Sequence, residues 1–160
     1  MELTRRSYLR ATAALAVVGT TGLAGCGSAD ADAETDAETA RLLPTEPNYD
    51  GWFDNADAYR GTYDLRGRHA VTVTVGAKDS LGYFSFDPAA IAVSPGTTVT
   101  WEWSGEGGAH NVVALEGAFR APLTDRAGTT FARTFDETGV YPYYCTPHRG
   151  MGMKGAVVVE

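Results

Sequence analysis

Near its C-terminus the chain carries a thiol, an imidazole and two thioethers within residues 143–155, YYCTPHRGMGMKG. Cys145 and His148 are three positions apart, so one short loop can bring both side chains to a common point. Met151 and Met153 follow, and either thioether is long enough to reach the same point. Soft sulfur and imidazole ligands favour copper, whereas zinc favours closed sets of Cys, His and carboxylates. Because thioether is a poor ligand for zinc, the sequence predicts a copper site.

Another strong ligand must come from elsewhere in the chain, which contains only His69, His110 and His148 as histidines. His110 follows a glycine-rich turn and opens a predicted strand, which suits a residue at the rim of a β-sandwich. Two histidines, one thiolate and a weak axial methionine form a blue copper electron-transfer site. His69 follows Arg66-Gly67-Arg68 and precedes a strand, so we expect it on the surface. Taken singly, Cys145 fits a core thiol and the methionines fit core filler; the combination favours the metal site.

Short β-strands must position these residues. Residues 70–75, AVTVTV, alternate with a period of two, and residues 98–103 place Val99, Trp101 and Trp103 on one face. Further strands are predicted at 82–86, 90–93, 111–115, 129–135, 140–145 and 155–159, with turn residues between them. Seven to eight such strands indicate an all-β, Greek-key sandwich. Residues 48–69 are rich in aromatic side chains, and we expect them to lie against the sandwich in irregular form.

The N-terminal residues indicate export. Arg5 and Arg6 precede a hydrophobic run over 11–25 that is short for a membrane-spanning helix, and together they resemble a twin-arginine (Tat) signal. The sequence LAGC over 23–26 resembles a lipobox, in which cleavage leaves Cys26 as the lipid-modified first residue. A signal-anchor helix, or a simply cleaved signal with an incidental cysteine, is the alternative. We predict a lipoprotein signal peptide over 1–25, a lipid-anchored acidic linker over 26–47 and a folded domain over 48–160.

The charge balance limits the class of partner. The chain has 20 acidic and 13 basic residues, a formal net charge of −7, which argues against nucleic acid because phosphates require Lys and Arg. Hydrophobic content of 44% is ordinary for a globular domain. An acidic surface with only two lysines suits a very salty environment.

Three stretches, FDPAAIAVSPGTTVTWEW, GGAHNVVA and YYCTPHRGMGMKGAVVV, resemble the cupredoxins, and within them the halocyanins, the small blue copper proteins of salt-loving archaea. The resemblance covers residues 48–160 and implies a cupredoxin (plastocyanin-like) sandwich. It implies that copper is bound by His110, Cys145, His148 and a methionine. Met153 is favoured because it stands two residues before a glycine at the final strand, and because in related Met-Gly-Met loops the second methionine binds. Asn111 matches a residue that ties the two ligand loops together.

The function that we expect is a one-electron carrier with one type 1 copper ion, anchored to the outer face of the cytoplasmic membrane through Cys26. We expect redox proteins as partners, no nucleic acid, no small-molecule substrate, and a monomer. The chain is not expected to be an enzyme, because a second copper centre would need more histidines than the sequence contains. The alternative is an extracytoplasmic protein for copper storage or delivery. The ring of His148, on a loop with Pro147 and Met151, is the expected edge for electron exchange.

Overall fold

The structure is a computed structural model, and it describes residues 40–160. The predicted signal peptide over 1–25, the lipidation site Cys26 and the linker as far as residue 39 lie outside the described residues. Within residues 40–160, no helix has both the length and the apolar character needed to cross a membrane.

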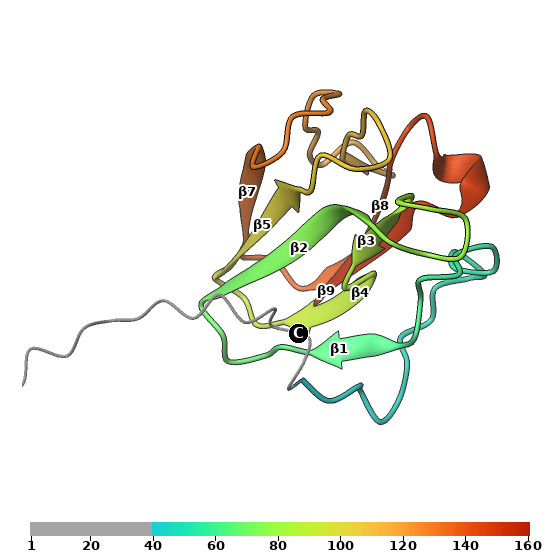
Figure 1. The fold of residues 1–160 in the computed structure, drawn as a ribbon. Coiled ribbons are helices and arrows are strands. Elements are labelled where there is room, and N and C mark those ends of the chain that lie inside the picture. The colour runs from blue at the N-terminus through green and yellow to red at the C-terminus, as the bar shows by residue number, and fades with distance from the viewer. Residues whose placement is uncertain (1–39) are drawn as a thin grey trace, which may run out of the picture. The chain divides into compact units, whose positions relative to one another are not determined.

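Two β-sheets make up the described fold (Figure 1). One sheet has the order β1-β4-β9-β8-β6 and the other the order β3-β2-β5-β7. The strands are β1 (Thr62–Asp64), β2 (Ala70–Ala77), β3 (Ser85–Asp87), β4 (Ala90–Val93), β5 (Thr97–Trp103), β6 (Val113–Ala114), β7 (Thr130–Phe135), β8 (Gly139–Tyr144) and β9 (Lys154–Val159). A 3₁₀ turn, η1, spans Arg149–Met151. The all-β sandwich is therefore confirmed, although the described residues contain nine strands rather than seven to eight.

The period-two pattern explains how the sheets pack. Alternate residues of β5, Val99, Trp101 and Trp103, are buried, and β2 buries its valines in the same way. These side chains join Ile91 of β4 and Val157 of β9 in one hydrophobic core that contains residues of both sheets. Apolar burial of this kind is the main stabilising contribution to such a domain.

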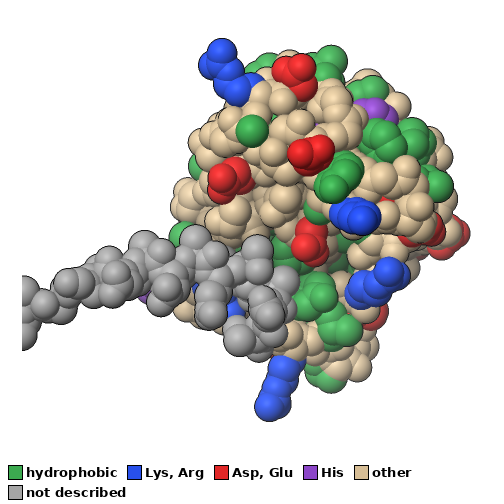
Figure 2. Space-filling model, in the orientation of Figure 1, with side chains coloured by type: hydrophobic (Ala, Val, Ile, Leu, Met, Phe, Trp, Pro, Cys, Tyr) green, Lys and Arg blue, Asp and Glu red, His purple; other side chains and the backbone are tan. Residues whose placement is uncertain are grey.

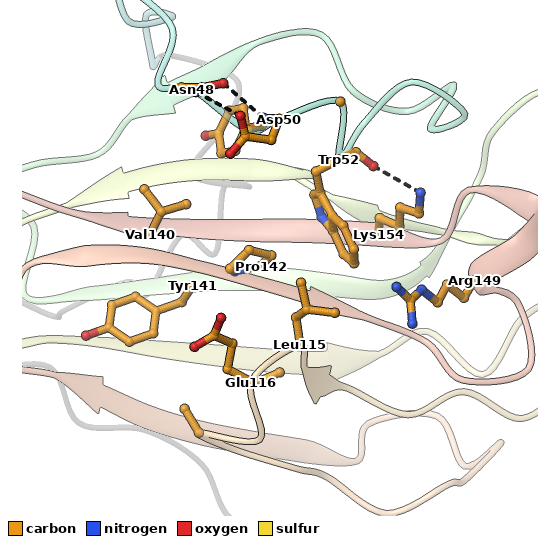
Figure 3. Close-up of a pocket in the computed structure, with 14 residues that line it drawn as sticks. Asn48, Asp50, Trp52, Leu115, Glu116, Val140, Tyr141, Pro142, Arg149 and Lys154 are labelled. Carbon is orange, nitrogen blue, oxygen red and sulfur yellow. Dashed lines mark hydrogen bonds between the residues drawn. The ribbon is translucent and has the colours of Figure 1, made fainter.

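Strand β9 is buried on both of its faces, because the segment before β1 covers the outer one. Phe53 and Ala56 of that segment pack with Ala89, Ala90 and Ala156 in a second, smaller cluster. Trp52 lies beside this sheet at one end of an open pocket of about 610 Å³ (Figure 3). A strand that is buried on both faces has a continuous run of apolar residues in its sequence, as in AVVV over 156–159.

The ordered domain begins earlier than the predicted residue 48. The backbone of Leu43 donates to Thr62 O at 2.8 Å, and Asp64 N donates to Arg41 O at 2.7 Å. The carboxylate of Glu46 accepts hydrogen bonds from Tyr59 Oη at 2.6 Å and from Thr62 N at 2.9 Å. The expectation of a linker extending to residue 47 is thus wrong for these residues, because specific hydrogen bonds fix a stretch that its composition assigned to the linker. The expectation that 48–69 is irregular is also wrong in part, because this range contains strand β1. With three residues, β1 is too short to show a periodic pattern in the sequence.

The surface combines scattered acidic groups with local apolar areas. Figure 2 shows acidic side chains spread over this face, with hydrophobic side chains gathered beside a histidine at the upper right. Leu81, Tyr83 and Met151 are among the exposed large hydrophobic residues.

Candidate metal centre

Backbone hydrogen bonds fix His110 on the connection that follows β5. His110 and Thr124 exchange two of them, His110 N to Thr124 O at 2.9 Å and Thr124 N to His110 O at 3.0 Å. The indole Nε1 of Trp103 also donates to His110 O at 3.0 Å. Because Trp103 is itself buried in the core, the position of His110 is tied to the packing between the sheets.

The loop after β8 positions the other candidate ligands. Cys145 directly follows the last residue of the strand, and its backbone N donates to Met153 O at 3.1 Å. His148 N donates to Cys145 O at 3.2 Å, which turns the chain back toward the thiol. Met153 N donates to His148 O at 3.2 Å and closes the loop. Hydrogen bonds across the loop therefore connect all three residues.

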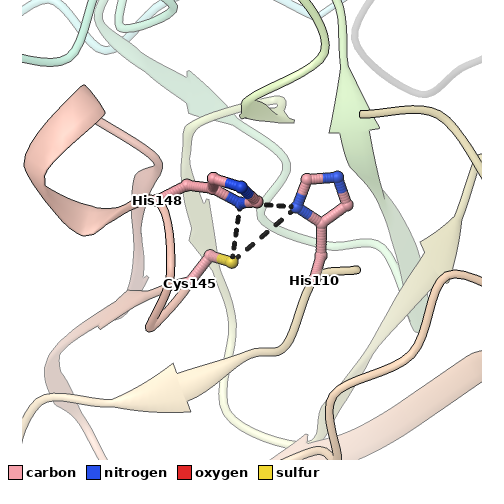
Figure 4. Close-up of side chains that lie close together, drawn as sticks. All are labelled: His110, Cys145 and His148. Atoms are coloured by element: carbon pink, nitrogen blue, oxygen red, sulfur yellow. Dashed lines mark hydrogen bonds between the residues drawn. The ribbon is translucent and has the colours of Figure 1, made fainter. Parts of the chain in front are cut away.

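These elements bring His110, Cys145 and His148 together (Figure 4). Their ligand atoms all lie within 4.8 Å of one another. Cys145 Sγ is 3.5 Å from His148 Nδ1 and 3.7 Å from His110 Nδ1, and the two Nδ1 atoms are 3.1 Å apart. One thiol and two imidazole nitrogens facing a common point are a donor set that suits copper.

The tautomer of His110 is fixed by a backbone carbonyl. Its Nε2 lies 2.8 Å from Glu106 O, and because a carbonyl only accepts, this nitrogen carries the proton in the neutral ring. Nδ1 is then left with a lone pair directed toward Cys145 and His148. A hydrogen bond on the distal nitrogen is the usual means of orienting a metal-binding histidine.

Burial sets the protonation of the three groups. It lowers the pKa of His110 and His148 below the ordinary value, and the neighbouring His110 lowers that of His148 further. Burial raises the pKa of the Cys145 thiol, while backbone hydrogen bonds from Asn111 and His148 act in the opposite direction. Neutral imidazoles are ready to bind a cation, and a bound cation deprotonates a thiol outright. The site therefore favours a metal ion over two charged histidines.

The two methionines differ in exposure. Met153 is 0% exposed and belongs to the same core cluster as Cys145, whereas Met151 is 39% exposed. Gly152 separates them and has φ of 92°, a left-handed conformation that favours glycine. Burial beside the thiol supports the prediction that Met153 is the axial ligand.

Asn111 does tie the two ligand loops together, as the resemblance implied. Its Oδ1 accepts from Thr146 N at 2.7 Å, and its Nδ2 donates to Thr146 Oγ1 at 3.1 Å. Asn111 follows one candidate ligand and Thr146 follows another, so the pair fixes the separation of the two loops.

Three neighbours of the site were not found from the sequence. An added Cβ on Gly76 or Gly107 would lie 3.1 or 3.0 Å from His110 Nε2, and both residues have positive φ, so only glycine leaves room for the ring. The ring of Phe84 lies 4.7 Å from that of His148, centroid to centroid. The glycine-rich turn before His110, which contains Gly107, was a visible signal, but nothing in the sequence placed Gly76 or Phe84 next to the site.

His69 is exposed, as predicted. It precedes β2, whereas Gly76 near the other end of that strand contacts His110. A strand rises about 3.3 Å per residue, so roughly 20 Å separates His69 from the three clustered residues.

Comparisons with known proteins address the family to which the chain belongs. Residues 71–160 match the family described as copper binding proteins, plastocyanin/azurin family. A halocyanin of Natronomonas pharaonis is 41% identical over 99% of both chains. A plastocyanin of Scenedesmus fuscus is 38% identical over 56% of this chain and 99% of its own length. A solved structure titled a novel purple cupredoxin from Nitrosopumilus maritimus is 30% identical, with a TM-score of 0.46 over 56% of this chain and 98% of that one. The chain belongs to the plastocyanin/azurin family of copper-binding proteins, as a halocyanin-like member.

Proposed function

We propose that this protein carries single electrons between redox proteins through one type 1 copper ion held by His110, Cys145, His148 and Met153. The observation that supports this most strongly is the convergence of one thiol and two imidazole nitrogens on a common point. Copper supplies a one-electron couple between Cu(I) and Cu(II). The protein holds the ligands in a fixed arrangement, so that little rearrangement accompanies the change of oxidation state.

A visible spectrum of the oxidised, copper-loaded protein tests this function. An intense thiolate-to-copper band, together with a reversible one-electron wave in voltammetry, is the expected result. A protein that stays colourless with Cu(II) and binds Zn(II) in its place would contradict the proposal, because a closed Cys/His zinc site would then be the better description.

The alternative of copper storage or delivery is less well supported. His110, Cys145 and Met153 are all buried, while a delivery site has to offer its ligands to a partner. We therefore expect slow loss of copper to an external chelator. Loss within seconds, without a reversible wave, would favour the delivery function.

His148 is the proposed exit for electrons. It is the one member of the proposed ligand set that is only partly buried, and Phe84 packs on its ring. Leu81, Tyr83 and Met151 present exposed apolar surface on the two loops that carry Phe84 and His148. At about 1 M salt the screening length is roughly 3 Å, so long-range steering is weak and apolar contact dominates docking.

The docking surface is tested by Met151→Glu against Glu116→Gln, which changes an exposed residue elsewhere by one charge. Measured at high salt, Met151→Glu should slow electron transfer to a redox partner more than Glu116→Gln. The reverse order would contradict docking through the apolar surface.

After export directed by the signal peptide over 1–25, membrane attachment is proposed through lipidated Cys26, on the outer face of the cytoplasmic membrane. Stable attachment requires two hydrocarbon chains, because one chain binds only marginally. The variant Cys26→Ser should be released into the soluble fraction with its copper spectrum unchanged. A membrane-bound Cys26→Ser protein would rule out this anchor.

A further inference from the structure

We propose that Trp52 and Asn55 are positioning residues for the copper site. They belong to residues 52–57, called the strap here, which lies against the loop formed by residues 149–155. The strap lies before residues 71–160, the part that matches the family model, and within the span over which the halocyanin of Natronomonas pharaonis aligns. This inference rests on the proposed copper site and concerns what holds Met153 in place.

Four hydrogen bonds connect the strap to the loop. Asn55 Nδ2 donates to Gly150 O at 3.3 Å, and Lys154 Nζ donates to Asn55 Oδ1 at 2.5 Å. Lys154 Nζ also donates to Trp52 O at 3.0 Å, and Trp52 Nε1 donates to Gly155 O at 3.0 Å. These bonds reach the loop on both sides of Met153, so they restrain the backbone that carries the proposed axial sulfur.

The strap backbone also lies directly against the loop. A Cβ added to Gly152 would lie 2.0 Å from Asn55 O and 3.0 Å from Ala56 Cα. No side chain fits in this space, and the φ of 92° at Gly152 disfavours one as well. Figure 1 shows the segment before β1 beside the η1 turn. The glycine between the two methionines is therefore required by the strap as well as by the turn.

Aromatic and cationic side chains extend this contact toward the thiol. The ammonium of Lys154 lies 4.9 Å from the centre of the Trp52 ring, and the guanidinium of Arg149 lies 5.4 Å from it. Arg149 is also 4.5 Å from the ring of Tyr144, the residue directly before Cys145. Figure 3 shows Trp52 with Lys154 reaching its backbone oxygen and with Arg149 at the same end of the pocket. Each such contact adds a modest attraction.

The far end of the strap reaches a second loop. The carboxylate of Asp57 accepts a hydrogen bond from the hydroxyl of Ser80, on the connection between β2 and β3. The same connection carries Phe84, which packs on His148. The strap is thus bonded both to the loop that follows His148 and to the connection whose Phe84 packs on His148.

A restraint of this kind matters because the axial bond in a blue copper site is long and weak. Such a bond does not by itself hold a flexible loop at a fixed distance. The hydrogen bonds of Trp52 and Asn55 supply the missing restraint, so the strap sets how closely the thioether of Met153 approaches the metal.

The variant Asn55→Ala tests this, with Asn48→Ala as the matched control. Asn48 is an exposed asparagine four residues before the strap, and among the described residues its side chain bonds to Asp50, 2.9 Å from Nδ2 to Oδ1. In copper-free protein, the Met153 amide of Asn55→Ala should exchange with solvent faster by roughly fivefold for each hydrogen bond lost. Trp52→Phe, which keeps an aromatic ring but loses the bond to Gly155, should have a similar effect.

In copper-loaded Asn55→Ala, the reduction potential should move toward that of Met153→Leu. We expect at least a twofold change in the ratio of Cu(I) to Cu(II) affinity, about 18 mV at 59 mV per tenfold, with altered electron paramagnetic resonance parameters. Asn55→Asp keeps the acceptor for Lys154 and should recover much of the wild-type potential. The control Asn48→Ala should keep both the potential and the exchange rate.

An unchanged potential in Asn55→Ala and Trp52→Phe, with a blue wild-type protein, would overturn the role of the strap and leave the proposed copper site intact. A fall in melting temperature without any change of potential or spectrum would assign the strap a structural role only, and would also overturn it. A wild-type protein without a blue band would instead contradict the proposed function, and the exchange rates of the copper-free variants would then decide about the strap alone.

Discussion

Replacing Asn111 with alanine should destabilise the copper-free protein and loosen its metal site together. The side chain is 4% exposed and makes two hydrogen bonds to Thr146, of 2.7 and 3.1 Å. Each net hydrogen bond contributes about 1 kcal/mol, and a donor left without a partner costs about 1–3 kcal/mol more when it is buried. Thr146 is exposed, so water can replace part of the lost contact at its N–H.

We therefore expect Asn111→Ala to lower the free energy of unfolding by about 2–3 kcal/mol. For a domain of this size, that corresponds to a fall in melting temperature of roughly 10 °C. In the copper-loaded protein the two ligand loops should separate more easily, which should broaden the paramagnetic resonance spectrum.

Denaturant unfolding of the copper-free protein measures the first effect, and it allows the two bonds to be separated. Thr146→Val removes the hydroxyl acceptor and keeps the shorter backbone bond. Because it leaves Nδ2 of the buried Asn111 without that partner, it should cost about 1–3 kcal/mol. Asn48→Ala, on the exposed turn, should cost still less. A loss below 0.5 kcal/mol in Asn111→Ala would refute the conclusion that this side chain holds the two loops together.

Three further results are expected. Cys145→Ser should abolish the blue band, because a hydroxyl is a poor replacement for a thiolate; a retained blue spectrum would contradict the ligand assignment. Met153→Leu should keep copper but raise the reduction potential, whereas Met151→Leu should change it little; voltammetry giving the reverse order would exchange the two roles. Since burial lowers the pKa of His110 and His148 below the ordinary 6.5, the unfolded chain binds more protons at acid pH. Stability of the copper-free protein should therefore be level between about pH 7 and pH 8 and fall as pH drops below about 6.5. Equal unfolding midpoints at about pH 7 and about pH 5 would contradict that.

Much of the fold and site could be predicted because the signals were local. The alternating valines of β2 and the tryptophans of β5 indicated which face of each strand is buried, because side chains two residues apart point to the same face of a strand. The spacing of Cys145 and His148 placed two donors on one loop, and the glycine-rich turn before His110 placed the third donor at a rim.

The parts that could not be predicted depend on contacts between distant residues. Strand β1 has three residues and is defined by parallel pairing with β4, from Thr62 opposite Ala90 onward, which no local pattern reveals. The composition around Glu46 assigned this residue to the linker, and only its hydrogen bonds to Tyr59 and Thr62 show that it belongs to the folded domain. The bonds from Trp52 and Asn55 to the ligand loop likewise span about a hundred positions in the sequence.

The complete burial of Cys145 has a consequence for the reactivity of the copper-free protein. Alkylating agents and oxidants attack the thiolate, which has to be both deprotonated and accessible. Here the sulfur is enclosed and its pKa is raised by burial, so neither condition holds in the folded state. Modification of Cys145 by iodoacetamide should therefore proceed only through opening of the ligand loop or of the whole domain. The rate of labelling would then report how often the copper-free protein opens and exposes the Cys145 thiol.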